Sequence, residues 1–159
     1  MTQQQHLAAR ESNERNGKDE IVITVSEVKN AQARLKFLPT KLGRYCIAFE
    51  SAVFNWMYRH AIAYNGGFWD FFDLSNGGFY LQPPQSYMIT SPNGFMDETT
   101  AQETGIIVTL MMLSHFSFVT YEKGHEAECE RISACFHQLR EFIFTLPLGS
   151  QTKILNAID

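Results

Sequence analysis

The chain has 159 residues, of which 45% are hydrophobic and 19% are charged, and its net charge is −4. This composition excludes a collagen-like, coiled-coil or wholly disordered chain and provides enough apolar material for a core without metals or disulfides. Three cysteines are too few for a disulfide framework, and the first residues lack the apolar stretch of a signal peptide, so we expect a protein of a reducing cytoplasm.

Charge is distributed unevenly along the sequence. Residues 1–20 are polar and almost free of large apolar side chains, which predicts a flexible arm before one domain over residues 21–159. Residues 21–59 carry six Lys or Arg and two Glu, whereas residues 60–122 carry six Asp or Glu and no Lys or Arg. A basic beginning is therefore followed by an acidic middle.

The first part of the predicted domain contains one long helix. A β-branched run over residues 21–25 predicts a short strand, and the Pro and Gly signals within residues 37–43 predict a break in regular structure. Apolar residues then recur at intervals of three and four over residues 44–64, the spacing of an amphipathic helix. We expect Asn65-Gly66-Gly67 to end this helix, because Asn and Gly accept the left-handed backbone conformation.

The middle of the chain is predicted to form antiparallel strands. Residues 68–74 and 78–82 are rich in aromatic and β-prone side chains, and they flank the turn sequence Ser75-Asn76-Gly77. Asn-Gly is typical of a type I′ hairpin turn, which requires a positive φ at both residues. Residues 86–90 are predicted to add a third strand.

The last third is predicted to be helical. Thr100 and Glu103 have the spacing of a capping box, which predicts a helix from there to about residue 121. Its polar interruptions favour a core helix buried nearly all round over a membrane span. A further helix is expected over residues 126–145, and Ser150 is expected to cap a short final one. The sequence thus predicts an α+β domain in which a small antiparallel sheet packs against three to four helices.

Few residues have the spacing of a catalytic or metal site. His125, Cys129, Cys135 and His137 contain two metal-ligand types, but Cys135 is rotated by about 240° from Cys129 around a helix. Because Cys129 also belongs to an apolar stripe, a buried cysteine is the favoured interpretation, and His60 and His115 are expected to be structural. We expect no metal, no cofactor and no enzymatic activity.

Two groups of residues remain candidates for binding. Asp70 and Asp73 are three apart, so a strand places them on opposite faces and a paired-carboxylate site is disfavoured. The glycine turns beside Trp69 and Asp70 present backbone N–H groups that can donate to an anion, so a small-ligand or enzymatic site that uses these turns is the alternative function, although turn geometry alone explains the glycines. The basic residues between 29 and 44 are interpreted as a solvated face, with DNA contact as the weaker alternative.

Several motifs carry a resemblance to a known family. The sequence resembles the ArdB/KlcA family of antirestriction proteins over about residues 33–159. The most specific blocks are Tyr64-Asn65-Gly66-Gly67-Phe68-Trp69 and Leu74-Ser75-Asn76-Gly77-Gly78-Phe79-Tyr80, and the likeness extends to the terminal Ala157-Ile158-Asp159. The polar arm is longer than the family's usual beginning.

The resemblance implies a function and a fold. Members are encoded on plasmids and other mobile elements and protect incoming DNA from type I restriction enzymes while sparing methylation. The implied fold is a compact α+β domain with a small antiparallel sheet. No enzymatic activity is established for the family. The implied partner is the type I restriction-modification system, reached directly or through a host factor, with a monomer or weak dimer as the expected oligomeric state.

Charge density bears on the mechanism. A protein that imitates DNA must approach one negative charge per about 1.7 Å of axis. Residues 60–122 carry six acidic side chains, which is far too few for such imitation. The C-terminal residue Asp159 ends the chain with two carboxylates, and we expect Ile158 to dock on the domain and Asp159 to form part of an acidic contact surface. Trp69, Asp70 and Asp73 are the other candidates for binding.

Overall fold

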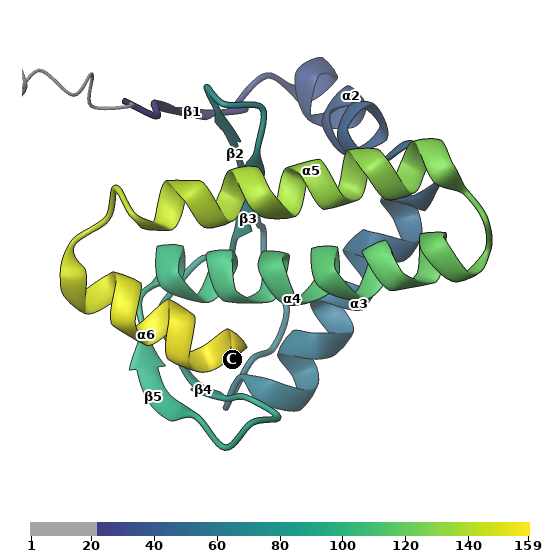
Figure 1. The fold of residues 1–159 in the computed structure, drawn as a ribbon. Coiled ribbons are helices and arrows are strands. Elements are labelled where there is room, and N and C mark those ends of the chain that lie inside the picture. Colours follow the sequence, from purple (N-terminus) through teal and green to yellow (C-terminus); the bar gives the residue numbers. More distant parts are fainter. Residues whose placement is uncertain (1–21) are drawn as a thin grey trace, which may run out of the picture.

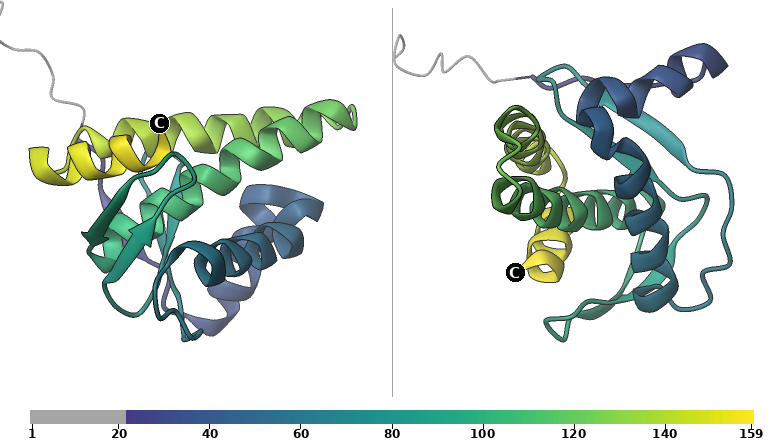
Figure 2. Two further views of the ribbon diagram at one scale, coloured as in Figure 1. Left: turned by 90° about the horizontal axis from the view of Figure 1, so that it is seen from below. Right: turned by 90° about the vertical axis from the view of Figure 1, so that its right-hand side faces the viewer.

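The computed structural model describes residues 22–159, so the predicted arm over residues 1–20 lies outside the described residues. Figure 1 shows two long antiparallel helices, α4 and α5, in front of a small sheet, and Figure 2 shows α2 and α3 on the other side of the molecule from α5 and α6. The elements, in chain order, are β1 (Val25–Glu27), α2 (Ala31–Leu42), a 3₁₀ turn (Gly43–Tyr45), α3 (Cys46–His60), β2 (Asp70–Leu74), β3 (Phe79–Gln82), β4 (Tyr87–Thr90), β5 (Met96–Thr99), α4 (Ala101–Glu122), α5 (Glu126–Ile143) and α6 (Leu148–Ile158).

The strands form two antiparallel sheets, which confirms the predicted α+β class and corrects its details. The central hairpin of β2 and β3 is present, but its third strand is β1, in the order β1-β2-β3. The strand predicted over residues 86–90 instead pairs with β5 in a separate two-stranded sheet. β5 was not predicted, because its sequence Met96-Asp97-Glu98-Thr99 has little β propensity and is held by its partner.

The turn between β2 and β3 differs from the predicted type I′ turn. Gly77 has a φ of 96°, but Asn76 does not have a positive φ: Ala63 is the one non-glycine residue within 22–159 that does. Gly77 N–H donates to Leu74 O, and Leu74 N–H donates to Gly78 O, which closes a three-residue loop with glycine at its left-handed position. The prediction of positive φ at Asn76 was therefore wrong.

The segment before the first long helix is itself helical, contrary to the predicted break. α2 runs through Pro39 to Leu42, and only then does Gly43, with a φ of 59°, change the direction of the chain. Asn30 caps the helix by accepting hydrogen bonds from Gln32 N and Ala33 N. The stabilisation from this cap and from the burial of Phe37, Leu38 and Leu42 outweighs the loss of the backbone hydrogen bond that Pro39 cannot donate.

Two predicted helix ends are also displaced. α3 ends at His60 rather than at Tyr64, because Ala61 forms a bridge with Ile89 and Ile62 N–H donates to Met88 O. Pairing with β4 therefore ends the helix before the chain reaches Gly66 and Gly67. α6 starts at Leu148 after Pro147, so Ser150 lies inside the helix and does not cap it.

Helix α4 lies at the centre of the packing, against α3, α5, α6 and β3. By length and composition it is apolar enough to cross a membrane, but 56% of its apolar window is buried inside the protein. Residues 103–110 are buried on every side of the helix, as predicted. Beyond them one face reaches solvent and exposes Phe118 and Tyr121, so for the second half of the helix that prediction was wrong.

Gly105 allows this close packing. A Cβ at this position would lie 2.0 Å from Leu81 O and 2.9 Å from the Cα of Gln82 in β3. Leu81 N–H also donates to the Thr109 hydroxyl one turn further along α4. The helix and strand therefore meet backbone to backbone at Gly105, where any side chain would push them apart.

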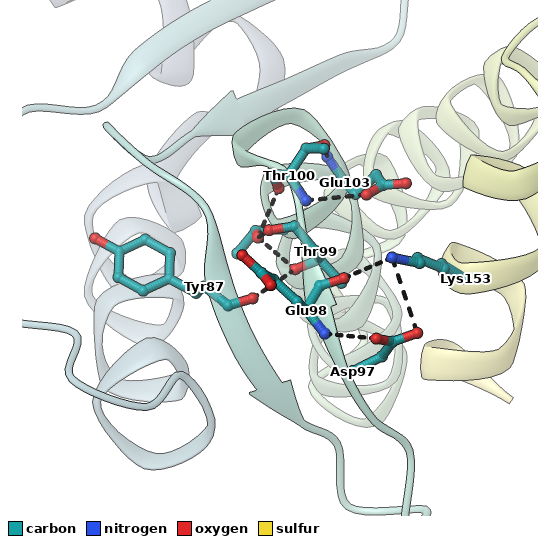
Figure 3. Close-up of polar contacts among 8 residues, drawn as sticks. Tyr87, Asp97, Glu98, Thr99, Thr100, Glu103 and Lys153 are labelled. Atoms are coloured by element: carbon teal, nitrogen blue, oxygen red, sulfur yellow. Dashed lines mark hydrogen bonds and ion pairs between the residues drawn. The ribbon is translucent and has the colours of Figure 1, made fainter.

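The start of α4 is fixed by the polar contacts drawn in Figure 3. Thr100 Oγ1 accepts from Glu103 N, and the Glu103 carboxylate accepts from Thr100 N, so the predicted capping box is confirmed. Lys153 of α6 donates to Glu98 O at 2.7 Å and lies 3.8 Å from the Asp97 carboxylate. These contacts join β5, α4 and α6 at one end of the molecule.

Candidate functional site

Trp69 is a packing residue in the structure. Its side chain is 3% exposed, and its indole N–H donates to the Tyr64 hydroxyl at 2.9 Å. Tyr64 in turn packs edge to face against Tyr58 and Tyr87, and burial raises the pKa of its phenol. The Tyr64-to-Trp69 block thus closes a loop on itself and presents no free indole to a ligand.

The two candidate aspartates lie in β2 and form no carboxylate pair. Asp70 is opposite Gln82, and Asp73 is opposite Phe79, in the hairpin register. Asp73 forms an ion pair with Lys41 of α2 at 2.9 Å. The Lys41 ammonium also donates to Gly77 O, so this pair attaches α2 to the hairpin loop.

Other residues pack against one side of each glycine turn. Asn76 Nδ2 donates to Gln138 O of α5, and its Oδ1 accepts from Gly78 N. A Cβ on Gly78 would approach Leu139 N at 3.1 Å, which shows how closely the loop contacts α5. Gly67 lies under the ring of Pro84 in the same way. Contacts within the protein therefore account for both glycine turns without a ligand.

Most basic residues between 29 and 44 have partners inside the protein. Lys29 lies 3.5 Å from Glu27, Lys41 pairs with Asp73, and Arg44 pairs with Glu128 at 3.0 Å. The Arg44 guanidinium helps to lower the pKa of Glu128, although that residue's own backbone N–H contributes more. This segment is therefore a set of internal contacts rather than a row of free cations for phosphates.

The histidines and cysteines are dispersed. Within residues 22–159 no three His, Cys, Asp or Glu side chains are placed to hold a metal ion. His125 is hydrogen-bonded to the Tyr45 hydroxyl, and Cys129 contacts Ser117 O at 3.6 Å. Cys135 is buried, which raises the pKa of its thiol, and His60 is hydrogen-bonded to Thr90 O.

Asp159 follows α6, whereas the candidates Asp70 and Asp73 lie in β2. Ile158 is half-buried and packs against the core while Asp159 is exposed. Figure 1 shows the C-terminus below α4, whereas β1 and the β2–β3 end of the sheet lie above α5. The sequence candidates therefore do not converge on one site.

A groove that the sequence did not indicate runs between α2 and α3. Its volume is about 670 Å³, and its walls expose Leu35, Ile47 and Phe68 by 78%, 79% and 70%. We call it the α2–α3 groove; the residues that line it are Lys29, Ala31, Arg34, Leu35, Leu38, Pro39, Cys46, Ile47, Glu50, Phe68 and Phe71. Three large apolar side chains with most of their surface in water are unusual around one depression.

Arg34 is the fixed polar group of this groove. Its guanidinium carbon lies 4.4 Å from the ring centre of Phe68 and 4.2 Å from that of Phe71. Its Nη2 donates to Trp69 O at 2.8 Å, so the side chain is held in one place by two aromatic faces and one hydrogen bond. Sequence inspection missed it because Phe68 and Phe71 approach α2 only in the fold.

Comparison with known proteins yields a consistent group of relatives. A family model described as "Antirestriction protein" matches residues 62–159. An antirestriction protein KlcA of Escherichia coli is 37% identical over 115 residues, which cover 69% of this chain and 77% of that protein. The protein YfjX of Escherichia coli K12 is 30% identical over 147 residues, covering 88% of this chain and 90% of its own length.

A solved structure shares the fold. It comes from work on the KlcA and ArdB proteins, which show a novel fold and antirestriction activity against type I DNA restriction systems in vivo but not in vitro. The match has a TM-score of 0.74 at 35% identity and covers 86% of this chain and 95% of that one.

Proposed function

Since the chain belongs to the ArdB/KlcA family of antirestriction proteins, we propose that it protects incoming mobile-element DNA from type I restriction in the cytoplasm of a bacterial host. The match of the whole fold to a KlcA/ArdB structure is the observation that carries this proposal. The family is not a known enzyme family, and we infer that the protein acts by binding rather than by catalysis.

The surface charge argues against imitation of DNA. Of the acidic residues in the middle of the chain, Asp73 is paired with Lys41, Asp97 lies beside Lys153, and Glu103 is buried in the capping box. Neutralised and buried carboxylates do not reproduce the regular charge of a phosphate backbone. Direct DNA binding is equally weakly supported, because Lys41 and Arg44 are engaged in ion pairs within the protein.

A protein partner is the remaining kind of target. It would be a subunit of the restriction system or a host factor on which restriction depends. The relatives' activity in vivo but not in vitro supports a route through a host component.

A small-ligand or enzymatic site near Trp69 and Asp70 is not favoured. The indole is buried and hydrogen-bonded, and Pro84 and Gln138 each pack against one of the glycine turns.

The test is the plating efficiency of unmodified phage on a strain with a type I restriction system, with and without the protein. We expect the protein to raise plating by at least tenfold and to leave a non-restricting strain unchanged. Equal plating on the restricting strain would overturn the proposed function.

A further inference from the structure

We propose that the α2–α3 groove binds an amphipathic helical segment of a protein partner, and that an acidic side chain of this segment pairs with Arg34. The inference rests on the proposed function, because it identifies the surface through which the protein reaches the restriction system or a host factor. Apart from Phe68, the residues that line this groove lie outside the two sequence blocks that carry the family resemblance.

The shape of the groove fits a helix. Ala31, Arg34, Leu35 and Leu38 recur at intervals of three and four, so they form one continuous face of α2. From Ala31 to Pro39 this face is about 12 Å long at 1.5 Å per residue, which matches about two turns of a docked helix. Such a helix would insert large apolar side chains spaced i, i+4 and i+7.

The exposed apolar surface favours a protein over a small molecule or nucleic acid. Leu35 and Ile47 project with more than three quarters of their surface in water. Side chains this exposed form low, open walls, and a small ligand would not be enclosed to the usual 70–90% of its surface. Phosphates would gain nothing from aliphatic walls, whereas apolar side chains of a partner would bury them.

Arg34 determines the charge that the partner must carry. A guanidinium has five N–H donors, and the described structure shows one hydrogen bond from Arg34, to Trp69 O. Phe68 and Phe71 pack against the guanidinium, whose N–H donors all lie in its plane, so its remaining donors are available along the edge of that plane. A planar fork with fixed orientation matches a carboxylate through two parallel hydrogen bonds.

The opposite wall completes the charge pattern. Glu50 of α3 is half-buried in the groove and forms no ion pair within residues 22–159. A docked helix with an acidic residue towards Arg34 and a basic residue towards Glu50 would satisfy both walls. This polarity also sets the direction in which the helix lies.

The experiment places a photoreactive amino acid at position 47 of the full chain, in cells that carry a type I restriction system, and at position 148 as the control. Leu148 is 76% exposed and lies at the start of α6, so it matches Ile47 in exposure but not in place. We expect one protein adduct that depends on position 47. Mass spectrometry should map it to an amphipathic helix with an Asp or Glu beside its apolar stripe.

Charge exchange then tests the pairing. Arg34→Glu should reduce the adduct at least tenfold, and changing the mapped acidic residue to Arg should restore it. Arg34→Lys, which keeps the charge and much of the packing, should reduce it by a smaller factor, and Arg140→Glu on the exposed surface of α5 should not change it. Melting temperatures of all variants separate lost binding from lost folding.

The outcomes are distinct. An adduct with nucleic acid, with a second copy of the chain or with a small molecule would overturn the inference. So would the same adducts at positions 47 and 148, no adduct at position 47, or an adduct unaffected by Arg34→Glu in a folded protein. If wild-type protein gives no relief of restriction, the proposed function fails, while the adducts still decide what occupies the groove.

Discussion

The first half of α4 and the α2–α3 groove are both rich in apolar side chains, but the fold uses them in opposite ways. Ile106, Ile107 and Leu110 of α4 have no exposed surface, whereas Leu35 and Ile47 are more than 75% exposed. In the first region apolar groups stabilise the fold. In the second they contribute little to the stability of the isolated chain, because they stay in water after folding, as is expected of a surface that a partner covers.

The motifs of the family resemblance belong mainly to the first kind of region. Asn76 attaches the hairpin to α5, and Tyr64 and Trp69 form a closed pair. Gly105, outside the two blocks, is likewise a packing residue and brings α4 against β3. These contacts explain why the motifs identify a fold. The comparison therefore predicts that motif variants change stability and that groove variants change activity.

The largest effect on stability is expected for Gly105→Ala. The added methyl group would overlap Leu81 O, so α4 or β3 must move, at a cost of about 3 kcal/mol or more in the free energy of unfolding. Gly149→Ala is the control, because nothing lies within 4 Å of that position in α6 and alanine favours a helix. Denaturant titration measures both variants; equal stability of the two would contradict the backbone contact.

Asn76→Ala with Gly77→Ala should have the next largest effect. The double variant loses the hydrogen bonds to Gly78 N and Gln138 O and forces alanine into a φ of 96°. We expect a loss of about 2–3 kcal/mol, seen as a lower melting temperature. An unchanged melting temperature would show that the loop does not need this anchor on α5.

Tyr64→Phe should cost about 1–2 kcal/mol at neutral pH, because the buried Trp69 N–H loses its acceptor. The raised pKa of Tyr64 adds a pH dependence. Its contribution is fully present below its ordinary pKa of 10.0, and it declines above that pH because the unfolded chain loses the proton first. Urea titration at pH 8 and above pH 10 should show a smaller alkaline loss in the variant than in the wild type; parallel losses would refute the assignment.

Asp159→Asn should change activity without changing stability. The residue is exposed at the end of α6, and we predict that it belongs to an acidic contact surface. The melting temperature should stay the same while relief of restriction falls several-fold. Full activity, in this variant or in a chain that ends at Ala157, would remove the terminus from the contact surface.

The smallest effect is expected from deletion of residues 1–20. Their nearly balanced charge and low apolar content predict that a chain of residues 21–159 folds as one domain and relieves restriction as well as the full chain. Loss of relief in a folded 21–159 chain would make the arm a recognition element.

Local signals predicted local structure well in this chain. The capping box of Thr100 and Glu103 was correct because its four residues contain all the groups that form it. The β2–β3 hairpin was also found, but Asn76 does not have the predicted φ, because its amide binds Gln138, 62 residues away. α2 was not predicted because Pro39 is typical of a helix break, whereas in the fold the burial of α2 against other elements stabilises the helix through that residue.

The candidate site was hardly predictable from sequence. Leu35 and Ile47 occupy helix positions that look like core positions, and only the placement of α2 beside α3 leaves them in water. The packing of Arg34 against Phe71 likewise depends on the approach of β2 to α2, since the two residues are 37 positions apart in the sequence. Spacing rules describe one element at a time, whereas a groove requires two.

The most direct test compares Ile47→Glu with Leu148→Glu in the plating assay. Both replace side chains exposed by more than 75%, so both proteins should fold with melting temperatures close to that of the wild type. We predict that Ile47→Glu loses at least ten-fold in relief of type I restriction and that Leu148→Glu retains it. Full relief by Ile47→Glu would contradict the claim that the α2–α3 groove carries the function.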